Sequence, residues 1–236
     1  MKLKTSTILA LAAAVACMTS CLSKDGPIYS GTEMCTVVSS SRLVTDGGAT
    51  FNIVESYATA IPDTLKRIMA QCEVLKQTDE YGTEYDIKLT SFEPVLTRNP
   101  VKKSTIAEGA LGTDGINLSD CWIDGGYFNT YVNITEVPLS STRHFINLEW
   151  DDLKSNADTV YVSLRHNGFG ESFDNEEIDS DKLGISGYYA SFPLAGIISS
   201  AGKEFVLHID WEWFKNDSTK YLREKEKKSA DISLSK

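Results

Sequence analysis

Apolar and polar side chains alternate along much of this chain, and the alternation limits the folds open to it. Phe205, Leu207 and Ile209 alternate with Val206, His208 and Asp210, and the last two of these are polar. Successive side chains of a β-strand point to opposite faces, so a period of two predicts strands with one buried face. The same pattern occurs in residues 127–134 and 160–165.

Turn signals separate the alternating segments. Glycine, which readily adopts a positive φ, follows Asp or Asn in the segments 46–48, 124–126 and 167–168. No convincing helical period occurs before about residue 215. Short strands joined by such turns predict an all-β fold of the sandwich or barrel type.

A glycine-rich segment divides the chain into two β regions. Residues 107–115 contain three glycines and no periodicity, which is typical of a linker. We therefore predict one β domain at 34–107 and a second at 112–236. Charged and polar residues dominate the chain from Lys215 onward, so we expect the second domain to end in a frayed helix or a charged tail.

The N-terminus has the features of a secretory signal. Lys2 and Lys4 precede an uncharged, mostly apolar run that ends at Met18. This run is shorter than the roughly 20 residues that a membrane-spanning helix needs. The sequence therefore predicts a signal peptide at 1–20.

The residues around the predicted cleavage site resemble the bacterial lipobox, Met18-Thr19-Ser20-Cys21. The resemblance implies cleavage before Cys21 and lipidation of its side chain, followed by a polar tether at 21–33. Two or more acyl chains would make a lasting membrane anchor. A weaker lipobox ending at Cys17, and ordinary secretion with an unmodified Cys21, are the alternatives.

Charge and cysteine content restrict the partners. The signal carries two lysines and no acid, so the formal net charge changes from −10 for the whole chain to −12 for residues 21–236. Such a protein repels nucleic acid, and we expect it to attach to the membrane through lipid rather than through basic residues. Cys35, Cys72 and Cys121 are too few for a disulfide scaffold, although a Cys35–Cys72 bridge remains possible.

Several segments together resemble the NigD-like lipoproteins of the Bacteroidota. They are Trp122-Ile123-Asp124-Gly125-Gly126-Tyr127-Phe128-Asn129, His144-Phe145-Ile146-Asn147-Leu148, Leu164-Arg165-His166-Asn167 and Val95-Leu96-Thr97-Arg98. The resemblance implies a lipoprotein signal, a small OB-like barrel and then a β-sandwich. It also implies a role like that of a bacteriocin-immunity protein, and it brings no catalytic residues. Leu22 stands where some inner-membrane lipoproteins carry Asp, which favours the outer membrane, on its periplasmic or its external side.

The motifs of common enzymes are missing from the sequence. We find no GxSxG, HExxH or phosphate-binding loop, and Ser200 to Lys203 fits SxxK without the helix that motif requires. His144 and His166 lie on apolar strand faces, where hydrogen-bonded core histidines are more common than ligands. We therefore predict a protein without catalytic activity or cofactor. A hydrolase whose site has no local motif is the remaining enzymatic alternative.

Two oxygen-rich groups could in principle hold a hard cation. The first is an acidic segment at 171–181, and the second is the strand face of His208, Asp210 and Glu212. Because the spacing of a calcium-binding loop is absent, we interpret both as solvated surface and predict no metal site. The weak metal candidates in the acidic segment are Asp174, Glu176, Asp179 and Asp181.

Aromatic residues raise glycan binding as an alternative, because flat rings can stack on sugar faces. The weak binding candidates are Trp122, Tyr127, Trp211 and Trp213. Trp211 and Trp213 continue the apolar face of 205–209, so packing in a core is the competing interpretation. We predict a protein-binding envelope lipoprotein, with a glycan- or small-ligand-binding accessory protein as the alternative. The loops expected to carry recognition are 171–181 and 124–126.

Overall fold

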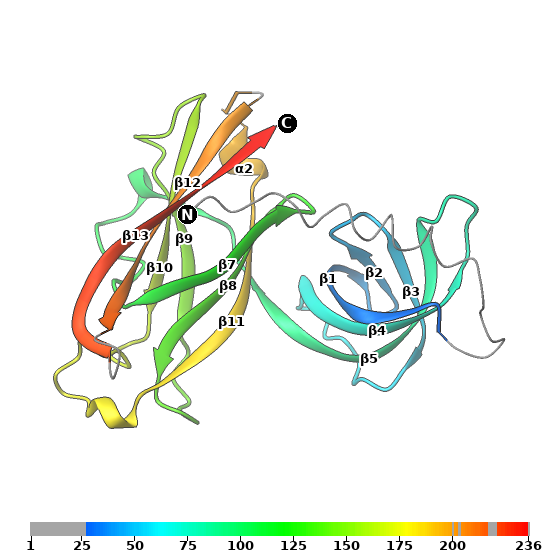
Figure 1. The fold of residues 1–236 in the computed structure, drawn as a ribbon, viewed down its shortest axis with the longest axis horizontal. Helices are drawn as coiled ribbons and strands as arrows, with labels where there is room; N and C mark the ends of the chain where they lie inside the picture. Colours follow the sequence, from blue (N-terminus) through cyan, green and yellow to red (C-terminus); the bar gives the residue numbers. More distant parts are fainter. Residues whose placement is uncertain (1–26, 200, 203, 217–220, 236) are drawn as a thin grey trace. The chain divides into compact units, whose positions relative to one another are not determined.

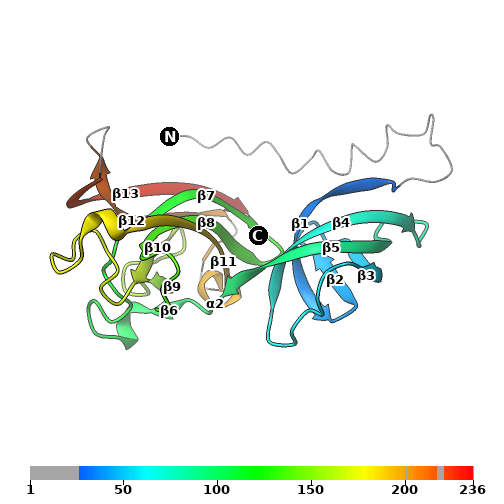
Figure 2. The same ribbon diagram turned by 90° about the horizontal axis from the view of Figure 1, so that it is seen from below.

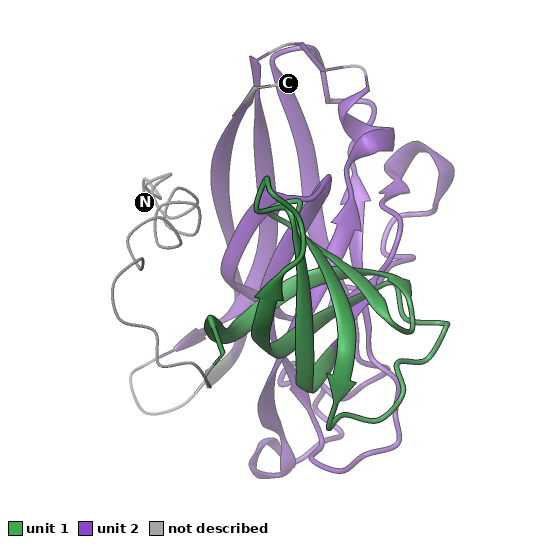
Figure 3. Ribbon diagram, turned by 90° about the vertical axis from the view of Figure 1, so that its right-hand side faces the viewer, with its two compact units in different colours: residues 1–93 green, residues 94–236 purple. Residues whose placement is uncertain are grey.

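A computed structural model describes residues 27–199, 201–202, 204–216 and 221–235. The chain forms two compact units, the first ending at Glu93 and the second beginning at Pro94 (Figure 3). The boundary predicted at 107–112 is therefore wrong. The predicted signal peptide and Cys21 lie outside the described residues.

The first unit consists of five strands. They are β1 (Tyr29–Ser39), β2 (Arg42–Thr45), β3 (Thr50–Ser56), β4 (Arg67–Gln77) and β5 (Glu84–Thr97), whose last residues belong to the second unit. The strands are ordered β3-β2-β1-β4-β5, and β3 also pairs in parallel with β5. This additional pairing closes the sheet into a small barrel of the OB type, as predicted (Figure 1). Because β1 begins at Tyr29, it includes the end of the predicted tether.

Alternation explains why this barrel closes around an apolar interior. Inward-facing residues such as Leu43, Ile68, Ile87 and Leu89 are at most 1% exposed. Arg67 is the exception, because its guanidinium is fully buried at the start of β4. The side chain donates two hydrogen bonds to the Asp46 carboxylate, at 2.6 and 2.8 Å, and one to the Thr36 hydroxyl at 2.9 Å.

The second unit is a β-sandwich, as predicted (Figure 2). Its first sheet contains the end of β5, β11 (Gly184–Pro193), β8 (Tyr127–Glu136) and β7 (Ile116–Asp124) in that order. The second sheet is ordered β13 (Tyr221–Ser235), β12 (Glu204–Asn216), β10 (Thr159–Asn167), β9 (Phe145–Trp150) and β6 (Val101–Lys102). Short helical turns lie at Lys103–Thr105, Ser180–Lys182 and α2 (Ala195–Ile198).

The two sheets bury the apolar faces that the alternation predicts. Phe128, Val132, Leu164, Leu207 and Ile209 are at most 2% exposed and belong to one continuous core. The residues between them on β10 and β12 face outward and are polar or half-buried. The period-two interpretation of these strands is confirmed.

The C-terminal segment is a strand, not the frayed helix or tail that we predicted. β13 pairs antiparallel with β12 along its length, from Glu204 opposite Ser235 to Asn216 opposite Tyr221 (Figure 1). Ile232 and Leu234 pack against the sandwich core. Charges dominate the strand because it is an edge strand with a solvated face, where apolar alternation is not required.

The predicted linker is part of the sandwich. The Asp114 amide donates to the His166 carbonyl at 3.0 Å, and the Asn147 side chain donates to the Leu111 carbonyl at 3.3 Å. Gly112 has φ +91° and lies so close to His166 that an added Cβ would overlap its carbonyl oxygen. The glycines of 107–115 therefore serve turns and a close backbone approach rather than flexibility.

Two further observations concern the whole described chain. Cys35, Cys72 and Cys121 are free thiols, the first two buried and the third half-buried. Among the described residues, no helix has the length and apolar character needed to cross a membrane.

Candidate functional site

The outer face of the second sheet carries a shallow groove, which we call the outer groove. It has a volume of about 340 Å³ and draws its lining from strands β10, β12 and β13 and the turns beside them. The lining residues are Lys103, Asp151, Lys154, Tyr161, Ser163, Arg165, Asp210, Trp211, Glu212 and Lys227. Half of them are the outward-facing neighbours of core residues in the alternating pattern of β10 and β12, so the fold itself places them on one face.

Ion pairs hold part of the outer groove in place. Lys103 Nζ lies 2.7 Å from Asp151 Oδ2, and Arg165 lies 3.0 Å from the buried carboxylate of Glu149. The hydrogen bond to Asp151 raises the pKa of Lys103. Lys154 Nζ sits 3.7 Å from the centre of the Tyr161 ring, a cation–π contact.

Three charged side chains of the outer groove remain available. Lys154, Glu212 and Lys227 form no ion pair with another described residue. Glu212 and Lys227 lie opposite each other in the β12–β13 register. The outer groove therefore offers charges of both signs, two aromatic residues and hydroxyls, which suits recognition of a polar surface rather than burial of an apolar ligand.

The strand face of His208, Asp210 and Glu212 does not converge on a metal site. His208 Nδ1 lies 2.6 Å from Asp231 Oδ1, and its Nε2 lies 3.2 Å from Asp210 Oδ1, so both ring nitrogens have partners. In the described part of the chain, no three His, Cys, Asp or Glu side chains are arranged to hold a metal ion.

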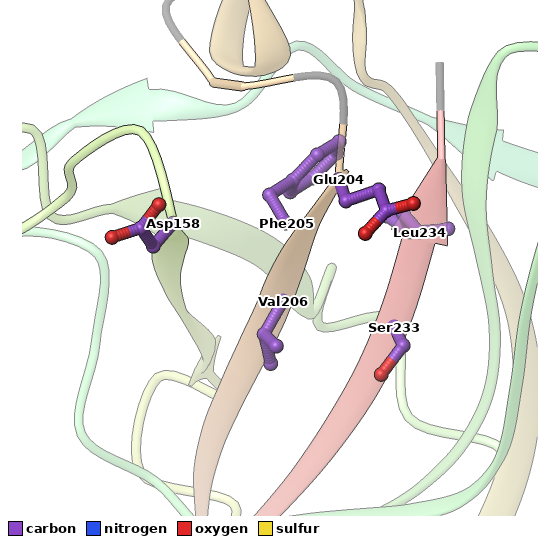
Figure 4. A pocket seen from close by; sticks show the side chains of 6 residues that line it. All are labelled: Asp158, Glu204, Phe205, Val206, Ser233 and Leu234. Atoms are coloured by element: carbon purple, nitrogen blue, oxygen red, sulfur yellow. The ribbon is translucent and has the colours of Figure 1, made fainter.

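A second pocket lies where β10 and β12 begin and β13 ends. Its volume is about 440 Å³, and its lining residues are Asp158, Glu204, Phe205, Val206, Ser233 and Leu234 (Figure 4). The carboxylates of Asp158, just before β10, and of Glu204, at the start of β12, are drawn apart in Figure 4. This pocket combines few polar groups with an open edge, so we find no chemistry for it.

The acidic segment differs from our expectation of a solvated loop. Asp174 is partly buried and lies 2.6 Å from Lys225 Nζ, while Asp179 accepts a hydrogen bond from the Asp181 amide. Of the four weak metal candidates, Asp174 is ion-paired, and Glu176, Asp179 and Asp181 are exposed.

Glu171, at the start of this segment, is buried and contacts His144, which in turn contacts His166. Its Oε2 lies 3.2 Å from His144 Nε2, and His144 Nδ1 lies 3.0 Å from His166 Nε2. His166 Nδ1 lies 3.0 Å from the Gly115 carbonyl. We call these three side chains the His–His–Glu cluster. The prediction of hydrogen-bonded core histidines is confirmed, but the sequence did not point to Glu171, which a long loop brings to them.

The four aromatic candidates do not form a common surface. Trp122 and Tyr127 lie on the β7–β8 hairpin and are half-buried. Trp213 is 4% exposed and fills the core of the second unit, so it offers no free face. Trp211 packs partly against the sandwich core and also lines the outer groove.

Known structures share this architecture. A NigD-like immunity protein from Bacteroides caccae matches with a TM-score of 0.60 and 16% identity, over 87% of this chain and 96% of that one. A provisionally named toxin-related protein from Parabacteroides distasonis matches with a TM-score of 0.64 and 18% identity, over 88% and 94% of the two chains. A provisionally named lipoprotein from Bacteroides fragilis matches with a TM-score of 0.62 and 10% identity, over 86% and 97%. At these identities the likeness shows a common fold.

The sequence itself shows the family. No curated protein matches the chain. The family model described as the NigD-like C-terminal beta sandwich domain matches residues 98–224, more than half of the chain and nearly all of the sandwich. The protein therefore belongs to the family that carries the NigD-like C-terminal beta sandwich domain.

Proposed function

We propose that this protein is a non-enzymatic binding protein of the bacterial cell envelope, held at the outer membrane by lipid on Cys21. The outer groove is its surface for a protein partner. The observation that carries this proposal is the group of unpaired charges in that groove, Lys154, Glu212 and Lys227. Their charge is available to a partner without breaking an ion pair of the fold.

The comparisons support the class of function. One similar structure carries the name of an immunity protein and another that of a lipoprotein. An immunity-like protein acts by binding and masking its partner, which requires a surface and no catalytic group. Glycan binding is the alternative, and the scattering of the aromatic candidates over separate environments argues against it.

Photo-cross-linking in the native organism tests the binding surface. A photoreactive amino acid at Ser163, in the floor of the outer groove, should trap a protein partner, whereas one at Tyr57, exposed in the first unit, should not. The double change Lys154→Glu with Lys227→Glu should abolish the adduct.

A matched control locates the surface. Lys182→Glu reverses an exposed charge beside the acidic segment, and we expect it to leave the adduct unchanged. Loss of the adduct with Lys182→Glu but not with the double variant would move the binding surface to the 171–181 loop and contradict the proposal.

Membrane attachment has its own test. Cys21→Ala should release the protein from the membrane fraction, and mass spectrometry of the native N-terminus should find an acylated Cys21. An unmodified N-terminus at another residue would refute the lipid anchor and leave the binding proposal standing.

A further inference from the structure

The His–His–Glu cluster is an uninterrupted chain of hydrogen bonds inside the second unit. His166 is fully buried, and the His144 and Glu171 side chains are 8% and 9% exposed. The two rings are nearly parallel with centres 5.1 Å apart, much farther than the 3.0 Å between their nitrogens. The rings therefore meet edge to edge, as a hydrogen bond between imidazoles requires.

Both ends of this chain are acceptors. The Gly115 carbonyl can only accept, so His166 Nδ1 carries a proton. The Glu171 carboxylate also accepts: burial opposes its ionisation, but hydrogen bonds from Ser140, Thr142, Val137 and His144 lower its pKa to about 2. His144 Nε2 therefore carries a proton as well.

The bond between the rings needs a third proton. Three N–H groups on four ring nitrogens make one neutral imidazole and one imidazolium. His166 is the neutral partner, because burial and the neighbouring His144 together lower its pKa to about 4. The cation then resides on His144, beside the carboxylate that balances its charge.

The surrounding charges favour this arrangement. Glu136 on β8 and Asp174 both act on His166, and Asp174 is itself paired with Lys225. The Asp114 carboxylate accepts a hydrogen bond from the Gly168 amide, next to the cluster. The basic residues next to the two histidines along the chain are Arg143, which is exposed, and Arg165, which is paired with Glu149. The ionisable groups that face the two buried rings are therefore mainly acidic.

The cluster joins segments that no strand pairing joins. Glu171 accepts from the Val137 amide and from the Ser140 hydroxyl, and the Thr135 hydroxyl donates to the Glu171 carbonyl. It thereby connects the 137–144 segment, before β9, to the 168–175 segment, after β10. We propose that one proton shared by His144 and His166 closes these two segments onto the sandwich, so that their closure depends on pH.

The direction of the dependence follows from counting protons. If the pair loses its proton in alkaline solution, two N–H groups must serve three bonds, and a lone pair of His144 faces the carboxylate. If it gains a second proton in acid, His166 can no longer accept from His144. Closure is therefore strongest when the pair holds one proton, and it weakens on both sides.

Nitrogen-15 NMR of the histidine side chains in the intact protein tests the protonation state. At pH 6.5 we expect both ring nitrogens of His144 to carry protons and only Nδ1 of His166 to do so. His208→Gln removes the third histidine, which is half-buried outside the cluster, and completes the assignment. A neutral His144, or a proton on Nε2 of neutral His166, would overturn the proposal without any variant of the cluster having to fold.

Hydrogen exchange tests the consequence for the segments. Between pH 6.5 and 9, after correction for intrinsic exchange, protection of 137–144 and 168–175 should fall about tenfold or more relative to β8, the usual factor for a charge-assisted hydrogen bond. Glu171→Gln should abolish this dependence, because an amide can donate to neutral His144. Glu149→Gln, which removes another buried carboxylate of the same unit, should retain it. A Glu171→Gln variant with the original pH dependence would contradict the proposal.

Discussion

Single buried polar residues carry much of the specificity of this fold. Arg67 is fully buried, yet its guanidinium is matched by the carboxylate of Asp46 and the hydroxyl of Thr36. The Nη2 group of Arg67 donates to both oxygens of the Asp46 carboxylate, and such charge-assisted hydrogen bonds are stronger than those between neutral groups. Such a pair contributes little net stability over an apolar substitute, but removing one member leaves a buried charge uncompensated.

Arg67→Ala should therefore lower the free energy of unfolding of the first unit by about 3–5 kcal/mol. All four tryptophans lie in the second unit, so the measurement is hydrogen exchange of amides in β1–β5. The control is Arg42→Ala, which removes the exposed Arg42–Glu84 ion pair and should cost at most about 1 kcal/mol. Similar losses in the two variants would show that the buried Arg67–Asp46 pair stabilises the fold no more than the exposed Arg42–Glu84 pair does.

His166 predicts how stability responds to acid. Its pKa is about 4 in the fold and about 6.5 in the unfolded chain, so the unfolded chain takes up a proton first as the pH falls. The stability due to neutral His166 is present above pH 6.5 and is lost between 6.5 and 4, by about 2 kcal/mol at pH 5. Urea unfolding followed by tryptophan fluorescence should show this loss, and His166→Gln should reduce it. An unchanged loss in the variant would assign the acid sensitivity to other groups.

At the scale of elements, strand pairing determines which segments form strands where the composition alone does not reveal it. The alternation predicted the inner and outer faces of β8, β10 and β12, because each has one face in the core. It missed β13, because this edge strand carries mainly charged residues and shows little apolar alternation. Its strand conformation is fixed by pairing with β12 along its length. It could not locate the outer groove or the His–His–Glu cluster either, since both combine residues that are distant in sequence and meet only through the sheet topology.

If β13 is a structural strand, its inward apolar residues matter. Ile232→Ala should lower the free energy of unfolding of the second unit by about 1–3 kcal/mol, because this half-buried side chain packs on the core. Ser229→Ala on the same strand should change it by no more than about 0.5 kcal/mol. Tryptophan fluorescence in urea measures both variants. Equal and negligible effects would indicate that the segment behaves as the tail we first expected.

At the scale of the whole molecule, the boundary between residues 93 and 94 places the predicted linker, residues 107–115, within the sandwich. The glycine-rich composition of 107–115 misled the sequence analysis, because the same residue that loosens a linker also allows a close backbone approach such as that of Gly112 to His166. The family match, which begins at residue 98, agrees with the boundary of the compact units.

Two fragments of the chain test this boundary. Residues 94–236 keep β6 and the end of β5, which pairs Leu96 with Ala190 of β11. Residues 112–236 lose both, together with the Leu111 carbonyl that accepts from Asn147. We expect cooperative unfolding, followed by tryptophan fluorescence, from the longer fragment only. Equal stability of the two would restore the boundary that the glycines suggested.

The reactivity of the free thiols can be used to detect local opening of the structure. Burial raises the pKa of Cys35, and it raises those of Cys72 and Cys121 to about 11, so few thiolates are present at neutral pH. Modification of the buried Cys35 and Cys72 by an alkylating reagent must then wait for the barrel to open locally, whereas Cys121 is only half-buried. For a protein proposed to work in an oxidising envelope, the same burial shields these sulfur atoms from irreversible oxidation over the lifetime of the molecule.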